Sequence, residues 1–366
     1  MNRQEGKALE NSRNSSVDTF KFLAIGTVII HHTRAFYYSY DQYGGHALLL
    51  LKYFFYAVRF GIPYFFISAG YFFGKSLQKG RPLGQLTRRY CGRLTQLFIL
   101  WTIIYFFIPQ NFNDEVIKFG YMRTLYWHFT SIHLHIWDFI RHHFITFLFT
   151  GSRGHLWFFP AYITGILILS LFLFLKKEKY LIVFGLILYF VSLLGRSYKE
   201  FPIGFDPGFE IFYGPFISTF FIAIGLRFSR IDFSARKNHV IVLGFILIFT
   251  GLIVQFAENW FLFKYYKMVP EHAFLAGMIP LGIGIFLLSM GYQNLGKSTI
   301  FPYLGRYTLG VFVLHEMFIS MLKPVRCYFE PVTWDIAFPV IVFLLSLLTT
   351  MLLVRSPIGR ILVKQQ

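Results

Sequence analysis

Long apolar blocks, separated by short polar segments, dominate the pattern of this chain. Ten of the blocks are long enough, or nearly so, to cross the hydrocarbon core of a membrane, which takes roughly 20 helical residues. We therefore expect an all-α polytopic membrane protein with about ten transmembrane helices. The blocks cover residues 20–38, 47–73, 94–109, 155–175, 180–195, 211–226, 240–256, 272–290, 307–322 and 336–354.

Composition and charge agree with a membrane protein. Of the 366 residues, 55% are hydrophobic and 14% charged, whereas a soluble domain carries about a quarter charged residues. If the N-terminus is cytoplasmic, most of the 35 Lys and Arg residues fall in cytoplasmic segments, as the positive-inside bias requires. We expect cytoplasmic tails at 1–17 and 357–366, a transmembrane domain at 18–356, and no nucleic-acid partner, because the net charge of +18 follows from topology.

The first apolar block ends in ionisable residues. Lys21 and His32 are eleven residues apart, so they project from one helix face, about 16 Å apart along the axis. Asp18 lies one turn before Lys21 and can pair with it, whereas His31 points about 100° away from His32. Either Lys21 reaches the headgroups and His32 bonds a neighbouring helix, or these side chains mark a functional site within the membrane.

Two further blocks carry ionisable side chains to a similar depth. Arg59 lies near the middle of block 47–73, and Pro63 is expected to interrupt the helix four residues later. His315 and Glu316 lie well inside block 307–322. An arginine stays charged at that depth and needs anions, dipoles or water. Together with His32, these residues predict that the helices enclose a polar chamber.

A cytoplasmic loop between residues 75 and 93 contains six basic residues and no acidic one. Ordinary positive-inside topology explains such a loop. The alternative is a phosphate site, because Arg89 and Arg93 are one helical turn apart and face the same way.

The segment 110–154 is aromatic and amphipathic, and we expect it outside the membrane. An interfacial helix on the outer leaflet explains it best, with a re-entrant segment or a metal site at His133 and His142–His143 as alternatives. We expect no metal, because no acid or cysteine stands at a recognisable ligand spacing. Cys91 and Cys327 fall on opposite sides of the membrane and are not expected to pair. The histidines of the segment are His128, His133, His135, His142 and His143.

In their order and spacing, these motifs resemble the integral-membrane acyltransferase-3 family, bacterial enzymes that acylate cell-surface sugars. Three residues depart from the family pattern: Ala69 and Thr308, each in place of Ser, and Glu316, where Pro is common. The resemblance rests on Asp18, Lys21 and His32; on Arg59 followed by FGIPYFFISAGYFF; on Arg89 and Arg93, followed by Trp101 and Tyr105; on GHLWFFPA around His155; and on LGRYTLGVFVLH, which ends at His315.

The resemblance implies transfer of an acyl group, acetyl by family frequency, from cytoplasmic acyl-CoA to a hydroxyl of an extracytoplasmic glycan or related acceptor. It implies a bacterial cytoplasmic membrane and no tightly bound cofactor. His32 would act as general base or carry the acyl group covalently, with Asp18 and Lys21 toward the donor and Arg59 stabilising the oxyanion. The CoA phosphates would contact Arg89, Arg93 and Lys75, and the acceptor chamber would contain His155, Trp157, His315, Glu316 and Tyr307.

Two other functions fit the same pattern. A secondary transporter would use the ionisable residues as a proton-coupled substrate site, although the sequence contains no visible inverted repeat. A non-catalytic exporter of a polymer or small molecule would keep the fold without the chemistry. The oligomeric state is not indicated by the sequence.

Overall fold

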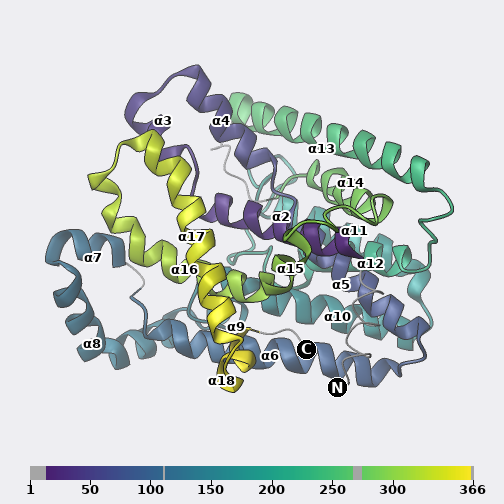
Figure 1. The fold of residues 1–366 in the computed structure, drawn as a ribbon, viewed down its shortest axis with the longest axis horizontal. Coiled ribbons are helices and arrows are strands. Elements are labelled where there is room, and N and C mark those ends of the chain that lie inside the picture. The colour runs from purple at the N-terminus through teal and green to yellow at the C-terminus, as the bar shows by residue number, and fades with distance from the viewer. Residues whose placement is uncertain (1–13, 110–111, 267–273, 364–366) are drawn as a thin grey trace.

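The protein is all-helical in the part that the computed structural model describes, residues 14–109, 112–266 and 274–363. No strand occurs in these ranges, which confirms the expected fold class. Helices α6 and α13 run along the long axis at opposite edges of the view, with α2 between them (Figure 1). The helices are α2 Ser15–His32, α3 Tyr37–Tyr43, α4 His46–Ala57, α5 Gly61–Gln78, α6 Leu83–Phe106, α7 Phe112–Phe119, α8 Tyr121–His142, α9 Phe144–Thr150, η1 Gly154–Trp157, α10 Phe158–Phe174, η2 Glu178–Tyr180, α11 Leu181–Leu194, α12 Pro215–Phe228, α13 Lys237–Tyr266, α14 Met278–Gly291, α15 Phe301–Leu304, η3 Gly305–Tyr307, α16 Thr308–Leu322, η4 Lys323–Tyr328, α17 Pro331–Leu353 and α18 Pro357–Val363.

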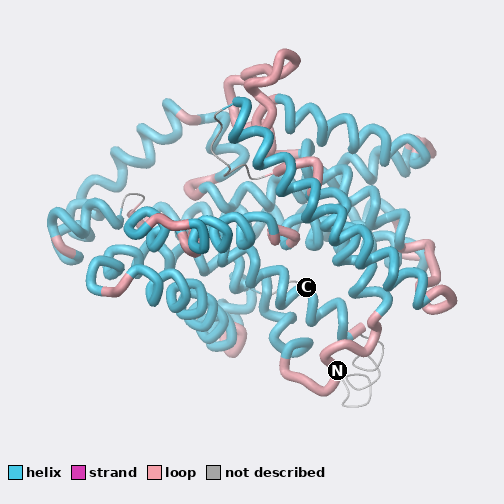
Figure 2. The backbone as a smooth tube through the Cα atoms, turned by 90° about the horizontal axis from the view of Figure 1, so that it is seen from above, coloured by secondary structure: helices cyan, strands magenta, loops and turns pink. Residues whose placement is uncertain are grey.

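Within the described residues, four helical segments are long and apolar enough to cross a membrane, by length and composition. Shorter apolar helices accompany them at His46–Phe55, Pro215–Phe228 and Met278–Gly291. Helices predominate over loops throughout the bundle (Figure 2). These helices are those of a polytopic membrane protein, while ten spans and cytoplasmic termini stay predictions. The four segments are Gly154–Phe174, Lys237–Tyr266, Phe301–Tyr328 and Pro331–Leu353.

One expected span is not a single helix. Helix α4 ends at Ala57 and α5 begins at Gly61, so Arg59 lies in a short break rather than in a helix. The expectation that the helix continues to Pro63 before it is interrupted is therefore wrong. A proline ring clashes with the carbonyl four residues earlier, here that of Arg59, so the new helix begins after that residue. In the first turn of α5, Pro63 needs no N–H and fits without cost.

Glycines bring α5 and α12 into backbone contact. A Cβ atom on Gly70 would overlap the carbonyl oxygen of Ile222, and one on Gly225 would overlap that of Ile67. The absence of side chains lets the two helices approach closely, as in other membrane bundles. Around this contact the core is aromatic; Phe66, for example, is fully buried.

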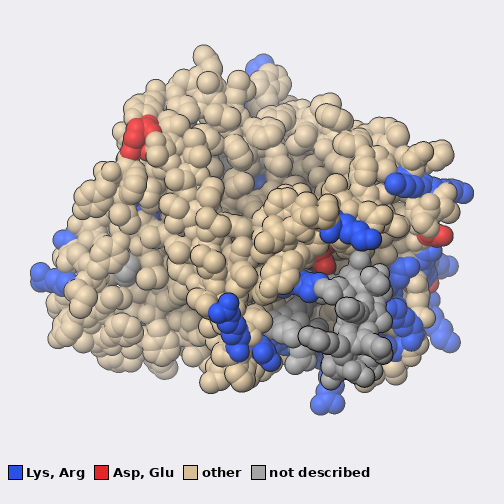
Figure 3. All heavy atoms as spheres, viewed as in Figure 1, with Lys and Arg blue, Asp and Glu red and all other residues tan. Residues whose placement is uncertain are grey.

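Basic side chains gather on one part of the visible face. In Figure 3 most Lys and Arg atoms lie at the right and lower edge, near the connections from α5 to α6 and from α12 to α13. The opposite end, with α7 and α8, carries exposed aromatic side chains such as Trp127 and Trp137. This separation is the pattern that the positive-inside bias and an interfacial outer segment produce.

The close approach of α5 and α12 predicts that Gly225→Ala and Gly70→Ala destabilise the folded protein. Each added methyl group must displace a backbone carbonyl, at a cost of about 1–3 kcal/mol or more. The measurement is the temperature of aggregation of detergent-solubilised protein, followed by size-exclusion chromatography.

Gly92→Ala in α6 is the matched control, because a Cβ there meets nothing within 4 Å. It is expected to leave stability unchanged or slightly higher, since alanine favours helix. Equal stability of all three variants would contradict the close packing.

Candidate active site

The structure brings His32 and Glu316 together. His32 is the last residue of α2, and its Nδ1 atom lies 3.6 Å from Oε2 of Glu316 in α16. Both side chains are partly accessible, at 29% and 26% of their full exposure. The carboxylate therefore faces one nitrogen of the imidazole and leaves the other for a substrate.

The end of α2 is fixed by local bonds. The Thr33 hydroxyl donates to the carbonyls of Ile29 at 2.9 Å and Ile30 at 3.1 Å, and the Thr33 backbone N–H also donates to the Ile29 carbonyl at 2.8 Å. Arg34 and Phe36 then adopt positive φ angles of 53° and 63°. The chain turns away at this point, so His32 stands at a helix end beside α16.

Two buried histidines extend this contact. The His315 ring lies 5.0 Å from the His32 ring and 5.3 Å from the His155 ring, centroid to centroid. His315 Nδ1 donates to the carbonyl of Phe312 at 2.5 Å. Its Nε2 atom, and both ring nitrogens of His155, have no hydrogen-bond partner among the described residues. His32, His155, His315 and Glu316 are called the histidine cluster below.

Tyr105 and Arg153 support the histidine cluster. The Tyr105 ring lies 4.9 Å from that of His155, and its hydroxyl donates to the carbonyl of Val313 at 2.7 Å. Arg153 stacks on Tyr105 at 5.7 Å and donates to the carbonyls of Ile108 and Pro109. Arg153 was not predicted from the sequence, where the available signal is a basic residue directly before the GHLW motif.

Arg59 lies on the other side of α2, not within the histidine cluster. It is buried, with 6% exposure, and is close enough to His31 to interact with it electrostatically. The His31 ring is 5.6 Å from that of His32. The two histidines thus differ in surroundings, as their helical positions predicted.

The remaining residues of the first motif lie at the far end of α2. Lys21 and Asp18 form the expected ion pair at 3.1 Å, and Lys21 Nζ lies 5.0 Å from the Phe72 ring centroid. With about 16 Å of helix between them and His32, they are outside the histidine cluster. Tyr307 is also outside it, since it donates to Tyr303 two turns before His315.

Trp157 follows His155 closely in the chain but faces an aromatic layer. Its ring lies 5.3 Å from that of Phe212 and 5.9 Å from that of Phe274. His155 itself is nearly fully buried, with 4% exposure. Of the two residues expected to contact the acceptor, His155 joins the histidine cluster and Trp157 does not.

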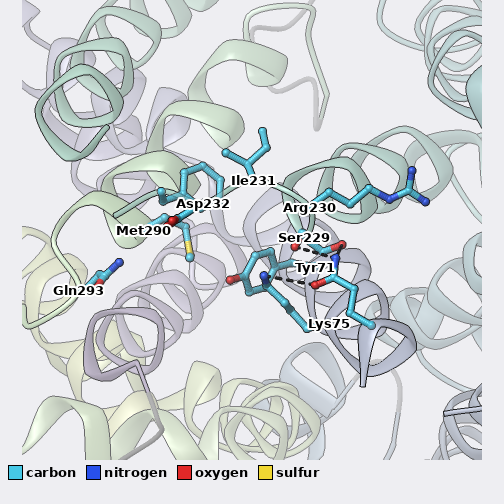
Figure 4. Close-up of a pocket in the computed structure, with 10 residues that line it drawn as sticks. Tyr71, Lys75, Ser229, Arg230, Ile231, Asp232, Met290 and Gln293 are labelled. Carbon is cyan, nitrogen blue, oxygen red and sulfur yellow. Dashed lines mark hydrogen bonds between the residues drawn. The ribbon is translucent and has the colours of Figure 1, made fainter. Parts of the chain in front are cut away.

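The three expected phosphate ligands are not in one pocket. Lys75 lines a cavity of about 410 Å³ with Tyr71, Ser229 and Gln293 (Figure 4). Arg89 is exposed on α6. Arg93, one turn on, donates to the carbonyl of Ile361 in α18 at 2.6 Å.

The cavity at Lys75 also contains an acidic residue. Asp232 lines it, and hydrogen bonds from the hydroxyl and backbone N–H of Ser234, together with the charge of Lys75, lower the pKa of this carboxyl. Because Lys75 is positively and Asp232 negatively charged, the pocket suits a ligand that carries both an anionic group and a hydrogen-bond donor. A ligand that carries both kinds of group could contact Lys75 through a phosphate oxygen and Asp232 through an N–H or O–H group.

Among the outer histidines whose side chains the structure describes, no group of three potential metal ligands forms; the side chain of His135 lies outside that description. His128 Nε2 contacts the carbonyl of Phe106 at 2.9 Å, and His142 Nδ1 lies 2.9 Å from Asp138 on the exposed face of α8. In the described ranges, the one group of three potential metal ligands is His32, His315 and Glu316. Both Cys91 and Cys327 are free thiols, as expected.

Comparisons with known proteins agree with the motifs. Residues 14–355 match a family described as an acyltransferase domain. An amino-acid racemase of Enterococcus faecalis is 23% identical over 86% of this chain and 42% of that protein. A serine/alanine racemase of Enterococcus gallinarum is 22% identical over 84% of this chain and 41% of that protein. The chain thus spans less than half the length of these relatives.

No solved structure matches the chain. The family match covers nearly the whole described bundle, including all four residues of the histidine cluster. The chain belongs to the acyltransferase-3 family.

Proposed function

We propose that the protein is a membrane O-acyltransferase that uses cytoplasmic acyl-CoA, most simply acetyl-CoA, to acylate a hydroxyl of an extracytoplasmic glycan or related acceptor. The observation that carries this proposal is the contact of His32 with Glu316. A carboxylate against one imidazole nitrogen orients the ring and stabilises its protonated form, so that the other nitrogen can accept a proton.

The proposed reaction begins with the acceptor hydroxyl bound at Nε2 of His32. His32 takes the hydroxyl proton as the oxygen attacks the thioester carbonyl, and a tetrahedral intermediate forms. The intermediate collapses by expelling the CoA thiolate, which receives the proton back from His32. Glu316 stays ionised throughout and stabilises the imidazolium.

Arg59 is proposed to stabilise the oxyanion of this intermediate. Buried in the break between α4 and α5, its charge acts at low dielectric, where such stabilisation is largest. Arg59 lies near His31, whose ring is 5.6 Å from that of His32. Lys75 and Arg89 are proposed to contact the CoA phosphates at the inner surface.

A secondary transporter is the second candidate. Ionisable side chains inside an apolar bundle favour it. The two relatives are named as racemases of amino acids. An amino acid is accordingly the small molecule to test as cargo. The cytoplasmic membrane is the proposed location in either case, with both termini inside.

A proteoliposome assay distinguishes the candidates. Reconstituted protein receives acyl-labelled CoA on one side and a glycan hydroxyl acceptor on the other, and parallel vesicles receive labelled L-serine. Label on the acceptor supports the acyltransferase. Accumulation of the amino acid without transfer of label rejects the acyltransferase in favour of transport.

For the His32–Glu316 contact we expect His32→Ala to remove acyl transfer and Glu316→Gln to reduce it. Loss of a general base costs about 10²–10⁴-fold in rate, and the neutral amide no longer stabilises the imidazolium. The measurement is the turnover of labelled acyl-CoA in proteoliposomes. His239→Ala, an exposed histidine at the start of α13, is the control that retains activity. Full turnover in His32→Ala would reject the mechanism.

For the donor we expect Arg89→Ala and Lys75→Ala each to raise the KM for acyl-CoA about 10-fold or more. A hydrogen bond to a charged group contributes about 1.5–3 kcal/mol. Lys237→Ala removes an exposed charge elsewhere on the inner surface and is the matched control. An unchanged KM in both test variants would reject the phosphate contacts.

Arg93→Ala could act through the donor or through the fold, because Arg93 donates to the Ile361 carbonyl in α18. Its loss would leave carbonyls at the end of α18 without this donor. A higher KM with normal protease resistance of α18 would assign Arg93 to the donor, and faster cleavage at α18 with unchanged KM would assign it to the fold.

A further inference from the structure

The histidine cluster contains more coordinating atoms than a general base requires. One potential ligand atom from each of His32, His315 and Glu316 lies within 4.8 Å of the others. The ring of His155, wholly buried behind them, lies 5.3 Å from that of His315. Three segments far apart in the sequence, α2, η1 and α16, thus supply three imidazoles and one carboxylate.

The buried nitrogens of the cluster point to a ligand. His315 Nε2 and both nitrogens of His155 lack a hydrogen-bond partner among the described residues. A buried polar atom without a hydrogen-bond partner destabilises the folded protein, so several of them in one place favour an occupant. Each neutral imidazole offers a lone pair there, which is what a metal ion requires.

The surroundings of His315 are those of a metal ligand. Its Nδ1–H donates to the carbonyl of Phe312, which fixes the tautomer with the lone pair on Nε2. Metal-bound histidines almost always donate their other ring N–H in this way. The bond also holds the ring in one orientation, toward His32 and His155.

The distances suit a small ion after a modest closure. Tetrahedral bonds of about 2.0–2.2 Å place neighbouring ligand atoms roughly 3.4 Å apart. The 3.6 Å between His32 and Glu316 is already close to that value. The three ligand atoms of His32, His315 and Glu316 lie within 4.8 Å of one another, so no pair needs to close by more than roughly 1.4 Å to reach that spacing.

We propose that the histidine cluster is a binding site for a divalent transition metal, with Zn²⁺ as the ion that its nitrogen-rich, four-ligand composition favours. The ligands are His32, His315, Glu316 and His155. Glu316 binds as the carboxylate, and any proton on His32 is released when the metal binds.

Metal binding and general-base catalysis exclude each other at His32. The contact with Glu316 makes Nδ1 of His32 the metal ligand, so the one proton of the neutral imidazole lies on Nε2, which then cannot accept the proton of the acceptor hydroxyl. The ion also takes the Glu316 carboxylate away from the imidazole. Zn²⁺ therefore inhibits acyl transfer, and a chelator restores it. This inhibition rests on the proposed function, whereas the metal site itself does not.

The experiment measures binding without reference to activity. Purified full-length protein in nanodiscs is stripped with a chelator and titrated with Co²⁺, whose visible absorption reports tetrahedral nitrogen ligands. Zn²⁺ is then added, and bound metal is counted by elemental analysis after dialysis. We expect one ion per chain, Co²⁺ absorption displaced by Zn²⁺, and loss of binding by at least 10-fold in His315→Ala and Glu316→Gln.

His142→Ala is the matched control, because His142 and Asp138 form an exposed pair that can hold metal adventitiously. This variant is expected to keep the stoichiometry of one. Absence of tetrahedral Co²⁺ absorption, or a stoichiometry that falls to zero in His142→Ala, overturns the metal site. A circular-dichroism spectrum and a size-exclusion profile like those of the unsubstituted protein establish that the cluster variants are folded.

Acyl transfer is then measured in metal-free and Zn²⁺-loaded protein. Activity that falls at least 10-fold on loading and returns with chelator supports the inhibition. Unchanged or higher activity with Zn²⁺ overturns it while leaving the measured site in place. Absence of acyl transfer in both states rejects the proposed function alone, because the Co²⁺ titration does not depend on it.

Discussion

The contact between His32 and Glu316 is the constraint on which the site depends. Ionisable side chains are costly inside an apolar helix bundle unless they have partners. Here α2 ends at the imidazole, and α16 places the carboxylate against it while burying His315 one residue earlier. His155 and Tyr105 then fill the space behind. The polar cluster is thus supported from three sides by packing that is otherwise apolar and aromatic.

Residue spacing and hydropathy predicted the features that depend on residues close together in the sequence. The Asp18–Lys21 pair follows from their spacing within one helix turn. Hydropathy located α10, α17 and the start of α13 within a few residues, whereas α13 continues to Tyr266, beyond the expected end at residue 256. The contact of Glu316 with His32 could not be predicted this way, because α2 and α16 meet only in the folded bundle. The sequence predicted that Glu316 lies in the chamber, but its contact with the His32 imidazole depends on how the helices pack in the folded protein.

Two differences from expectation have physical causes that hydropathy cannot detect. The break at Arg59 lies between apolar residues, so an average over a window hides it, although Pro63 sets its position. Arg93 fits the spacing of a phosphate ligand, yet it donates to the backbone of α18. An arginine near a helix end can serve either purpose, and charge alone does not distinguish them.

The four residues of the histidine cluster differ in exposure, and this difference separates the two proposed uses of the site. His32 and Glu316 are partly exposed, whereas His315 and His155 are buried. An acceptor hydroxyl needs only the accessible pair, so the buried imidazoles are not explained by acyl transfer. A metal ion would use them, because potential ligand atoms of the accessible pair and of buried His315 lie within 4.8 Å of one another, and the buried nitrogens have no hydrogen-bond partner among the described residues. The two uses therefore meet at His32, where a proton and a metal ion compete for one imidazole.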